Sequence, residues 1–437
     1  MIQGFFSAIA AINDFIWGYI AFFFILVLGA YFTFSSCLFQ IRKFKAIIAN
    51  FFELSHSQSA SVGVHPLKTF YAAIGGCIGI GNIVGICTAI QIGGPGALFW
   101  TWIGGFFGTL LQYAEVYLGM IYRVSNKQKS YDGGPMYFLP KAFKNKWIAV
   151  VSSALLCLYG VEIFMFNVMT NTLVTNWHLN KFLVVGALLV VVLVVALGGI
   201  ERVGLVGSKI IPPFVFLYLV MGLWIICIHL PELPHVLSVI SKGAFTYQAA
   251  IGGFAGSSVM LAISMGLSRG AYSADIGIGH MSVVHAESSE KDPAKQAALA
   301  FMVVLLDTFV FCSMSAILVV LTEKWHTCPD VVLMVQEALA MHFPYMNIFM
   351  PLFLFLLGYT TIIVYIAMGV KCAKFISPKY GPPAYYAIAT LGMTVFAFTD
   401  PTQAFIVESI CGAILLIINS LGIFRLRKEV KFNLGRD

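Results

Sequence analysis

The sequence predicts an all-α polytopic membrane protein with about 11 transmembrane helices. Of its 437 residues, 59% are hydrophobic and only 10% are charged, and the mean hydropathy is +0.90. Soluble domains carry roughly 25% charged residues, so this chain has too few charges to cover a water-facing surface. One crossing needs about 20 apolar residues, and about 40 residues per crossing with its connection suit about 11 crossings. The composition excludes a cytosolic enzyme and a disordered protein.

Apolar runs separated by polar interruptions set the expected positions of the spans. The first is an accessory helix, and the following ten form two groups of five. We expect spans at residues 15–39, 70–94, 96–122, 147–176, 181–199, 208–230, 250–283, 296–322, 344–370, 383–399 and 402–424.

Basic residues give the expected orientation of these spans. The chain has 26 lysines and arginines, and all but four fall on alternate connections and on the C-terminal tail. The exceptions are Lys181, Lys242 and Lys324, on the other side, and Arg269 inside a span. Cytoplasmic connections are enriched in lysine and arginine, so the N-terminus is expected outside and the C-terminus in the cytoplasm. Because the formal charge of +7 is distributed in this way, it indicates membrane topology and not binding to nucleic acid.

Two spans contain dense glycine clusters, at residues 75–85 and 266–280. A glycine inside a helix costs about 1 kcal/mol relative to alanine, so both spans are expected to unwind locally. The clusters are five spans apart, and a repeat of five spans has opposite orientations in its two copies. The pattern is typical of an inverted-repeat secondary transporter, in which unwound backbone at the midplane binds a cation and a carboxylate.

The expected organisation is one transmembrane transporter domain over residues 1–424. It comprises the accessory helix at 15–39, a first five-helix repeat at 70–230 and a second at 250–424. Residues 425–437 form a basic cytoplasmic tail.

The first glycine cluster has two interpretations. Its spacing, such as Gly75 with Gly79 and Gly81 with Gly85, also permits simple close packing of helices. Asn82 favours a binding role, because a polar amide in the middle of a membrane needs a partner. A phosphate-binding loop is excluded by the spacing and by the absence of a strand-then-helix pattern.

Ionisable residues within spans are costly, and they are candidates for function. Asp275 is the strongest, because it lies inside the second glycine cluster, where its carboxylate could face a substrate ammonium or a cation. Arg269 is expected to compensate a buried acid, Asp307 or Asp275. The remaining candidates are Glu115, Glu162, Asp307 and Glu408.

Thr360 and Thr361 place two hydroxyls in an apolar stretch of the third span of the second repeat. They could bond to carbonyls of their own helix, or they could act with carbonyls of the first break, such as that of Gly75, as ligands for sodium. No catalytic motif and no transition-metal spacing is present, and the nine cysteines are scattered singly. We therefore expect neither an enzyme nor a protein with a bound cofactor.

Motifs along nearly the whole chain resemble those of the alanine or glycine:cation symporter family. The most specific is Gly79-Ile-Gly-Asn-Ile-Val-Gly85, and others follow at Gly93-Gly-Pro-Gly-Ala97, Asp132-Gly-Gly-Pro-Met-Tyr137, Gly253-Phe-Ala-Gly256, Arg269-Gly270 and Asp307-Thr308. The resemblance implies a fold similar to the leucine-transporter type, with five plus five inverted helices. It also implies sodium-coupled uptake of small neutral amino acids across the bacterial inner membrane.

Departures from the family pattern fall where the substrate is expected. After Ser273, where the family has Asn-Glu-Ala-Gly-Leu-Gly-Ser, this chain has Ala274-Asp-Ile-Gly-Ile-Gly-His280. In the fourth span Asn171 remains from the family's polar set, with Met169 at the apparent glutamine position. Near Thr361 the chain supplies Tyr365, Gly369 and Val370, where the family has Trp and a Gly-Glu pair. Fewer polar contacts should change which substrate is tolerated, because an unpaired polar group costs about 1–3 kcal/mol.

The predicted function is therefore sodium-coupled symport of a small neutral amino acid by alternating access. The predicted substrate-binding residues are Gly79, Gly81, Asn82, Asn171, Asp275, Gly277 and Tyr365. The predicted sodium ligands are Gly75, Thr360 and Thr361. Proton coupling, with Asp275 or Glu162 as the carrier, and a sensor that binds without transporting are the alternatives. The sequence does not predict the oligomeric state.

Overall fold

The computed structural model describes residues 2–56, 62–126, 129–196, 199–245 and 257–434. The motif at 253–256 and the last three residues of the basic tail lie outside these ranges. Most of the described chain is helical, as the composition predicts. Its only strands are a two-residue antiparallel pair, β1 (Val124–Ser125) and β2 (Tyr131–Asp132).

The helices follow one another through the whole described chain. The first half contains α1 (Ile2–Phe15), η1 (Ile16–Ala21), α2 (Phe22–Ser35), α3 (Phe39–Arg42), α4 (Phe44–Ser55), α5 (Pro66–Cys77), η2 (Ile80–Asn82), α6 (Val84–Gly93), α7 (Gly96–Ile121), α8 (Pro135–Phe143), α9 (Trp147–Tyr159), α10 (Ile163–Trp177), α11 (Lys181–Ala196) and α12 (Gly199–Ile228). The second half contains η3 (Leu230–Glu232), α13 (Leu233–Phe245), α14 (Ser257–Ser273), α15 (His280–Ala286), α16 (Pro293–Leu305), η4 (Leu306–Cys312), α17 (Ser313–Leu321), α18 (Lys324–Thr327), α19 (Met334–Ala340), α20 (Met346–Ile376), α21 (Gly381–Phe396) and α22 (Pro401–Arg425).

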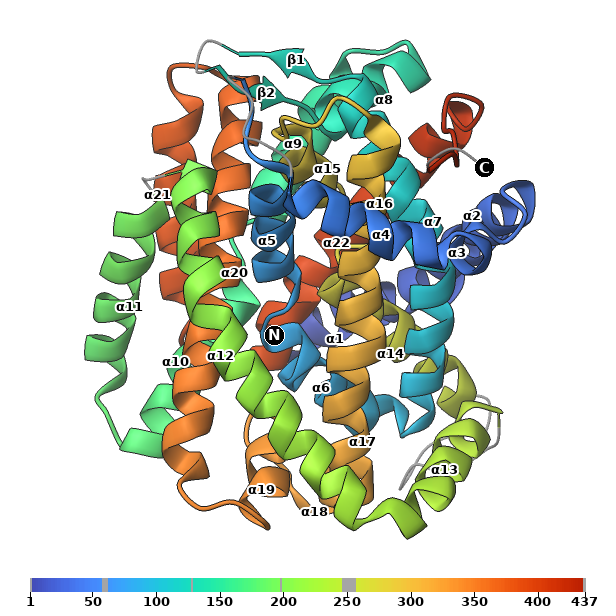
Figure 1. The fold of residues 1–437 in the computed structure, drawn as a ribbon. Helices are drawn as coiled ribbons and strands as arrows, with labels where there is room; N and C mark the ends of the chain where they lie inside the picture. The colour runs from blue at the N-terminus through green and yellow to red at the C-terminus, as the bar shows by residue number, and fades with distance from the viewer. Residues whose placement is uncertain (1, 57–61, 127–128, 197–198, 246–256, 435–437) are drawn as a thin grey trace.

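Every predicted span coincides with one or more of these helices, which form a single bundle (Figure 1). Within the described ranges, five helices are long and apolar enough to cross a membrane, and two bent helix pairs raise that number to seven. The five are Ser7–Ser35, Trp147–Trp177, Pro293–Leu321, Met346–Ile376 and Pro401–Arg425. The chain is therefore a multi-pass membrane protein, and the count of 11 crossings stays a prediction.

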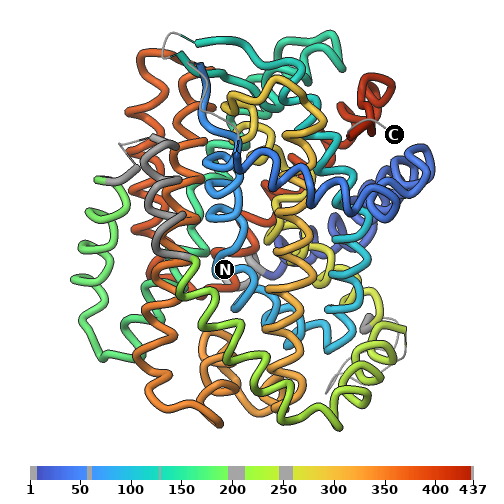
Figure 2. Tube along the Cα trace, viewed as in Figure 1, coloured from blue at the N-terminus to red at the C-terminus, as the bar shows by residue number. Residues whose placement is uncertain are grey.

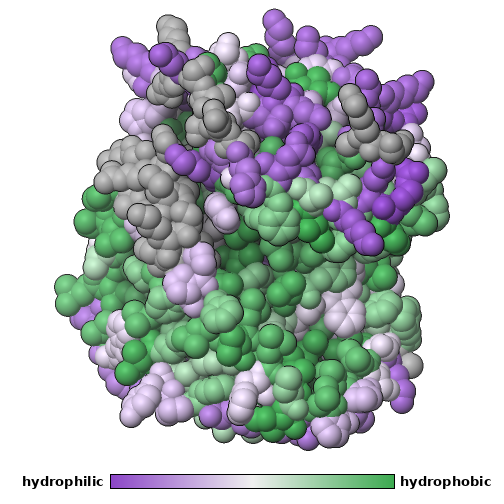
Figure 3. Space-filling view, viewed as in Figure 1, coloured by the Kyte–Doolittle hydropathy of each residue, from purple (hydrophilic) through white to green (hydrophobic). Residues whose placement is uncertain are grey.

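The surface has the distribution of polarity that a bilayer requires. Apolar side chains cover the middle of the visible face, and hydrophilic ones gather at the end that carries β1, β2 and α8 (Figure 3). α11 runs along one edge of the bundle (Figure 2), where Phe182 is 75% exposed and Leu183 74%. Large apolar side chains this exposed would be unfavourable in water, so this edge faces lipid.

The basic residues that the sequence places on the minority side lie at one end of the bundle. Lys242 is on α13 and Lys324 on α18, and both helices lie opposite to the end that holds β1, β2 and α8 (Figure 1). Exposed lysines of the majority side, such as Lys141 and Lys144, are at the α8 end. The two ends thus differ in charge as expected, and the assignment of the α8 end to the cytoplasm stays a prediction.

The interior of the bundle is formed around α7, which packs against α14 and α16. Gly266 of α14 shows how close this packing is, because a Cβ atom there would lie 2.3 Å from the carbonyl oxygen of Ala97. Gly266 and Gly270 are both helical. The local unwinding expected in the cluster at 266–280 is therefore confined to its second part, and the glycines of the first part serve close packing.

Candidate substrate and cation site

The first glycine cluster interrupts its helix, as predicted. α5 ends at Cys77 and α6 begins at Val84, and the two axes are bent by 51°. The side chain of Asn82 bridges the gap, because its Oδ1 accepts a hydrogen bond of 2.8 Å from the backbone N–H of Gly79. The unwound backbone is thus held by an amide from within the break itself.

The second break covers residues 274–279, between α14 and α15. Three residues there have positive φ: Asp275 at 54°, Gly277 at 71° and Gly279 at 124°. Glycine has no Cβ atom to oppose such angles, and aspartate is among the residues that tolerate the left-handed region. Gly81 of the first break lies against Ser273, where α14 ends, so the two breaks are in contact.

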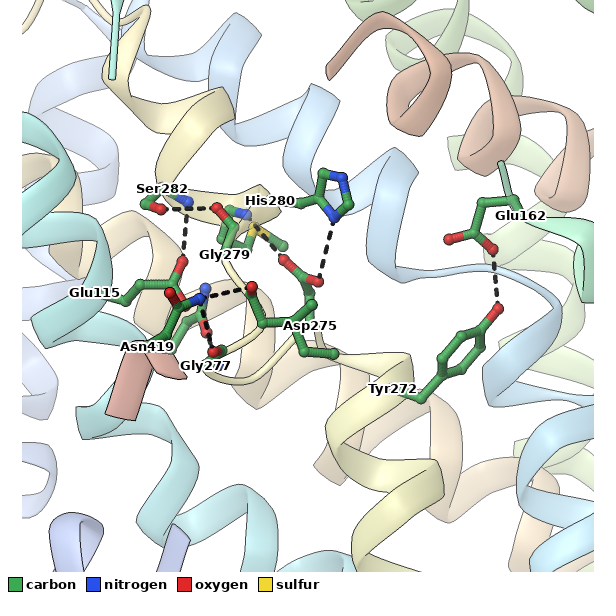
Figure 4. Close-up of polar contacts among 12 residues, drawn as sticks. Glu115, Glu162, Tyr272, Asp275, Gly277, Gly279, His280, Ser282 and Asn419 are labelled. Carbon is green, nitrogen blue, oxygen red and sulfur yellow. Dashed lines mark hydrogen bonds and ion pairs between the residues drawn. The ribbon is translucent and has the colours of Figure 1, made fainter. Parts of the chain in front are cut away.

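Asp275 has one satisfied and one free carboxylate oxygen. Its Oδ2 accepts a hydrogen bond of 2.8 Å from the N–H of Met281, at the start of α15. Its Oδ1 has no partner at hydrogen-bond distance and angle, lies 4.0 Å from Nδ1 of His280 (Figure 4), and belongs to a carboxylate that the Tyr365 hydroxyl and the N–H of His280 also face. Both side chains are buried, and neither ring nitrogen of His280 has a hydrogen-bond partner among the described residues. Unsatisfied polar atoms at this depth are costly and mark a place where a ligand can bind.

A small pocket lies beside this free oxygen. Asp275, His280 and Tyr365 supply its polar lining, and Gly76 and Cys77 at the end of α5 also line it. The ring of His280 stacks on Tyr159 at 5.4 Å and meets Tyr365 edge-on at 4.7 Å. The structure thus brings the predicted residues Asp275 and Tyr365 together, next to the first break.

Asp307 connects the two breaks. It lies in the π-helical segment η4, where its Oδ1 accepts hydrogen bonds from Nδ2 of Asn82 at 2.6 Å and from Oγ of Ser273 at 2.9 Å. The amide of Asn82 is therefore shared between its own break and Asp307. In this conformation it positions the first break and is not free for a ligand.

The expected ion pair of Arg269 with Asp307 or Asp275 is wrong. The guanidinium carbon of Arg269 lies 3.0 Å from the centre of the Phe405 ring, and the described residues include no ion pair of Arg269 with either acid. Hydrogen bonds from neutral donors satisfy Asp307 instead, and Asp275 is held by a backbone N–H. Neutral donors can hold a buried carboxylate without a cationic partner.

The two threonines of α20 differ in what they contact. Oγ1 of Thr361 lies 3.1 Å from the carbonyl oxygen of Gly75 and 3.0 Å from that of Leu357. A Cβ atom on Gly79 would be 2.5 Å from the same hydroxyl, so α20 packs directly on the first break. Thr360 donates only to Leu356 and Leu357 of its own helix. Gly75 and Thr361 are thus brought together as predicted, whereas Thr360 has the back-bonded conformation.

Two predicted substrate residues lie in other contacts. Asn171 donates to Asn167 at 2.7 Å and accepts from Lys181 at 2.8 Å, near the C-terminal end of α10. The N–H of Gly277 donates to Gln112, and its carbonyl oxygen accepts from Asn419. Asn171 and Gly277 are not among the residues that line the pocket, and in this conformation they anchor the helices around it. Gly79, Gly81 and Asn82 of the first break do not line the pocket either, so Asp275 and Tyr365 are the predicted substrate residues that do.

The end of the bundle near β1 and β2 is closed by ionic and backbone contacts. Arg123, after α7, donates to the carbonyl oxygens of Ser288 and Glu290 at 2.6 Å each. Lys371 of α20 forms ion pairs with Glu287 and Asp132. These contacts join four separate segments, so they would have to break before the pocket could open at this end.

The comparison with protein families identifies the chain. The model of the sodium:alanine symporter family matches residues 3–435. The chain belongs to this family. Its members are transporters, so the chain is a transporter and not an enzyme.

Curated relatives of the family span most of the chain. The probable sodium/glutamine symporter GlnT of Bacillus subtilis is 28% identical, over 96% of this chain and 87% of its own length. The sodium/alanine symporter AgcS of Methanococcus maripaludis is 26% identical, over 72% of this chain and 70% of its own length. Among solved structures, a mutant of the manganese transporter of Eremococcus coleocola has a similar fold, with a TM-score of 0.51 and 15% identity over 83% of this chain and 79% of that one.

The predicted substrate-binding residues of this transporter leave out His280, which lines the pocket, and Tyr159, whose ring stacks on His280. The sequence places His280 among the departures from the family, directly after the second break, and its replacement of the family's serine was a usable signal. Tyr159 gives no sequence signal, because nothing in its apolar span distinguishes it from a core aromatic residue. Met169, at the apparent glutamine position, lies with Ile80 of the first break against Gly358, so this departure does fall beside the site.

Proposed function

We propose that this transporter carries out sodium-coupled symport of a small neutral amino acid into a bacterial cell, across the inner membrane and by alternating access. The family supports coupled transport of an amino acid with a cation. The observation that carries the proposal is the free Oδ1 of Asp275, in a small pocket between two broken helices. A free carboxylate oxygen can bind the ammonium group of an amino acid, and the N–H groups of unwound backbone beside it can bind the carboxylate.

In the proposed binding mode, Oδ1 of Asp275 receives the substrate ammonium and Tyr365 flanks its side chain. The substrate carboxylate binds the first break at Gly79 and Gly81. There the N–H of Gly79 now donates to Asn82. A carboxylate is a stronger acceptor than an amide oxygen, so it would displace the Asn82 side chain from this N–H. The proposal leaves out Asn171 and Gly277.

The proposed sodium site comprises the carbonyl oxygen of Gly75 and the hydroxyl of Thr361. The contact of 3.1 Å between these two oxygens supports it. Sodium prefers hard oxygen ligands, and broken helices commonly supply them as carbonyls. Because Thr360 is fully engaged with its own helix, it contributes little in this proposal.

The proposed topology is that predicted from the sequence. It has 11 crossings, two inverted repeats of five helices, an external N-terminus and a cytoplasmic C-terminus. The positions of the two breaks, in α5–α6 and α14–α15, support the repeat, because each would interrupt the first helix of its unit. The end that carries β1, β2 and α8 is then the cytoplasmic one.

Uptake into proteoliposomes tests this function. A mixture of labelled amino acids is offered under an inward sodium gradient or an inward proton gradient, with protein-free liposomes as the control. We expect accumulation of one or a few small neutral amino acids with sodium only. Accumulation driven by the proton gradient alone would mean that the proton, and not sodium, is the coupling ion. Binding of an amino acid without accumulation under either gradient would identify a sensor.

A further inference from the structure

Two buried glutamates meet on one tyrosine hydroxyl, outside the pocket described above. Oη of Tyr272 lies 2.9 Å from Oε2 of Glu162 and 3.0 Å from Oε2 of Glu408 (Figure 4 shows the contact with Glu162). Glu162 is 1% exposed, Glu408 2% and Tyr272 4%. The three side chains come from the start of α10, the middle of α22 and the end of α14. We refer to them as the acid pair and its tyrosine.

If both glutamates are charged, the cluster has too few hydrogen atoms to form hydrogen bonds at both contacts of the Tyr272 hydroxyl. A tyrosine hydroxyl carries one hydrogen, so it can donate to one carboxylate only. An ionised carboxylate has no hydrogen to donate. Two oxygen–oxygen contacts of about 3 Å at one hydroxyl therefore need a second hydrogen, and only a protonated carboxyl group can supply it.

No cation satisfies the acid pair among the described residues. The charge of Arg269 acts on Tyr272, but its guanidinium lies over the ring of Phe405. It forms no ion pair with Glu162 or Glu408 in the described part of the chain. The N–H of Phe164 lies 3.4 Å from Oε1 of Glu408, which is a neutral contact. The other titratable groups that interact with the cluster are Cys77, Tyr159, Arg269, Asp275, Tyr365, Tyr385 and Cys411, and Arg269 does so through Tyr272.

We propose that Glu162 and Glu408 bind one proton between them, at a site distinct from the substrate pocket and from the proposed sodium ligands. The proton lies on one carboxyl oxygen, which donates to Oη of Tyr272, and this hydroxyl donates to the other carboxylate. On release the proton goes to water, and two like charges then face one hydroxyl. Like charges at this depth repel strongly, so release separates α10 from α22 or admits water or a cation.

The position of the site connects this proton to transport. Glu162 has a φ of 56° at the point where the helix of α9 is interrupted before α10, and Tyr272 is in the last turn of α14 before the second break. Repulsion within the pair therefore acts on the interruption before α10, and the hydroxyl contacts of Tyr272 connect the pair to the end of α14. Asp275, three residues after Tyr272, would move with the end of α14. The transport rate of this protein is thus sensitive to pH whichever cation drives accumulation.

Infrared spectroscopy of the purified protein in lipid tests the site without requiring transport. A protonated carboxyl group has a carbonyl stretching band that an ionised one lacks, and a pH titration follows its loss. We expect this band in the wild type, its loss in both Glu162→Gln and Glu408→Gln, and a frequency shift in Tyr272→Phe, which keeps both acids but removes the hydroxyl. Glutamine resembles the protonated acid in shape and charge, so both variants should fold. Glu115→Gln is the matched control, because Glu115 is equally buried but accepts from the N–H of Ser282.

The outcomes separate this site from the other buried acids. A Tyr272-sensitive band that persists in Glu115→Gln and disappears in Glu408→Gln supports the proposal. Sodium-driven uptake should then vary with pH in the wild type and by less than twofold in Glu408→Gln over the same range. The proposal would be overturned by a carboxyl band that neither glutamine substitution nor Tyr272→Phe changes. It would also be overturned if the infrared titration shows both glutamates ionised at every pH.

Discussion

Asp275 is the residue on which the substrate proposal depends at the residue scale. We expect Asp275→Asn to lower substrate affinity at least about tenfold, because a hydrogen bond to a charged group contributes about 1.5–3 kcal/mol. The asparagine Oδ1 can still accept from the N–H of Met281, so the second break should keep its shape. Equilibrium binding of labelled substrate, with thermal unfolding as the folding control, measures both. Unchanged affinity in a folded variant would remove Asp275 from the substrate site.

Thr361 and Thr360 form a matched pair for the cation site. Thr361→Val removes the hydroxyl that touches the Gly75 carbonyl, whereas Thr360→Val removes one that bonds only to its own helix. We expect the sodium concentration for half-maximal uptake to rise roughly tenfold or more in Thr361→Val and to change little in Thr360→Val. Both substitutions keep the size of the side chain. Equal shifts in the two variants would contradict the assignment of Thr361.

At the scale of elements, the second break is fixed by glycine where a side chain has no room. Gly279 has a φ of 124°, and a Cβ atom there would lie 2.6 Å from Cγ of Pro135. We expect Gly279→Ala to destabilise the protein by roughly 1–3 kcal/mol and to lower its melting temperature in detergent. Gly85→Ala is the control, because nothing lies within 4 Å of the added Cβ atom in α6. Equal melting temperatures for the two variants would mean that the break does not need glycine.

The elements also show which interruptions can be predicted from a sequence. The first break was predictable because glycines cluster at residues 75–85 and lower the helix propensity of one short stretch. The interruption before Glu162 has only Gly160 nearby, and the π-helical turn at Asp307 has no glycine at all. Tertiary contacts hold both of these, and such contacts are not visible in local propensity.

The orientation of the whole molecule in the membrane is tested with reporter fusions. Alkaline phosphatase fused after Lys324 should be active, because this connection is predicted to be external. The same enzyme fused after Lys144 should be inactive, and a green fluorescent protein after Asp437 should fluoresce in the cytoplasm. These results follow from the excess of basic residues at one end of the bundle. Active phosphatase after Lys144 with inactive phosphatase after Lys324 would reverse the topology.

Across the whole molecule, composition and periodicity predicted the helical membrane class and the segments that form helices. The glycine clusters and the resemblance to the family predicted that Asp275, Tyr365, Gly75 and Thr361 belong to one site with the first break. The sequence did not predict which of several buried partners a side chain contacts. Arg269 packs on an aromatic ring, and Asn171 bonds near the end of its helix. One-dimensional spacing cannot rank such partners, since the choice depends on which helices are neighbours.

The central claim is that sodium and an amino acid move together through this protein. Its most direct test is the reverse coupling, in which an inward gradient of the transported amino acid drives uptake of radioactive sodium into proteoliposomes. We expect sodium uptake that requires the amino acid, and we expect Thr361→Val to abolish it at sodium concentrations that saturate the wild type. Amino-acid uptake with no accompanying sodium movement would contradict the account.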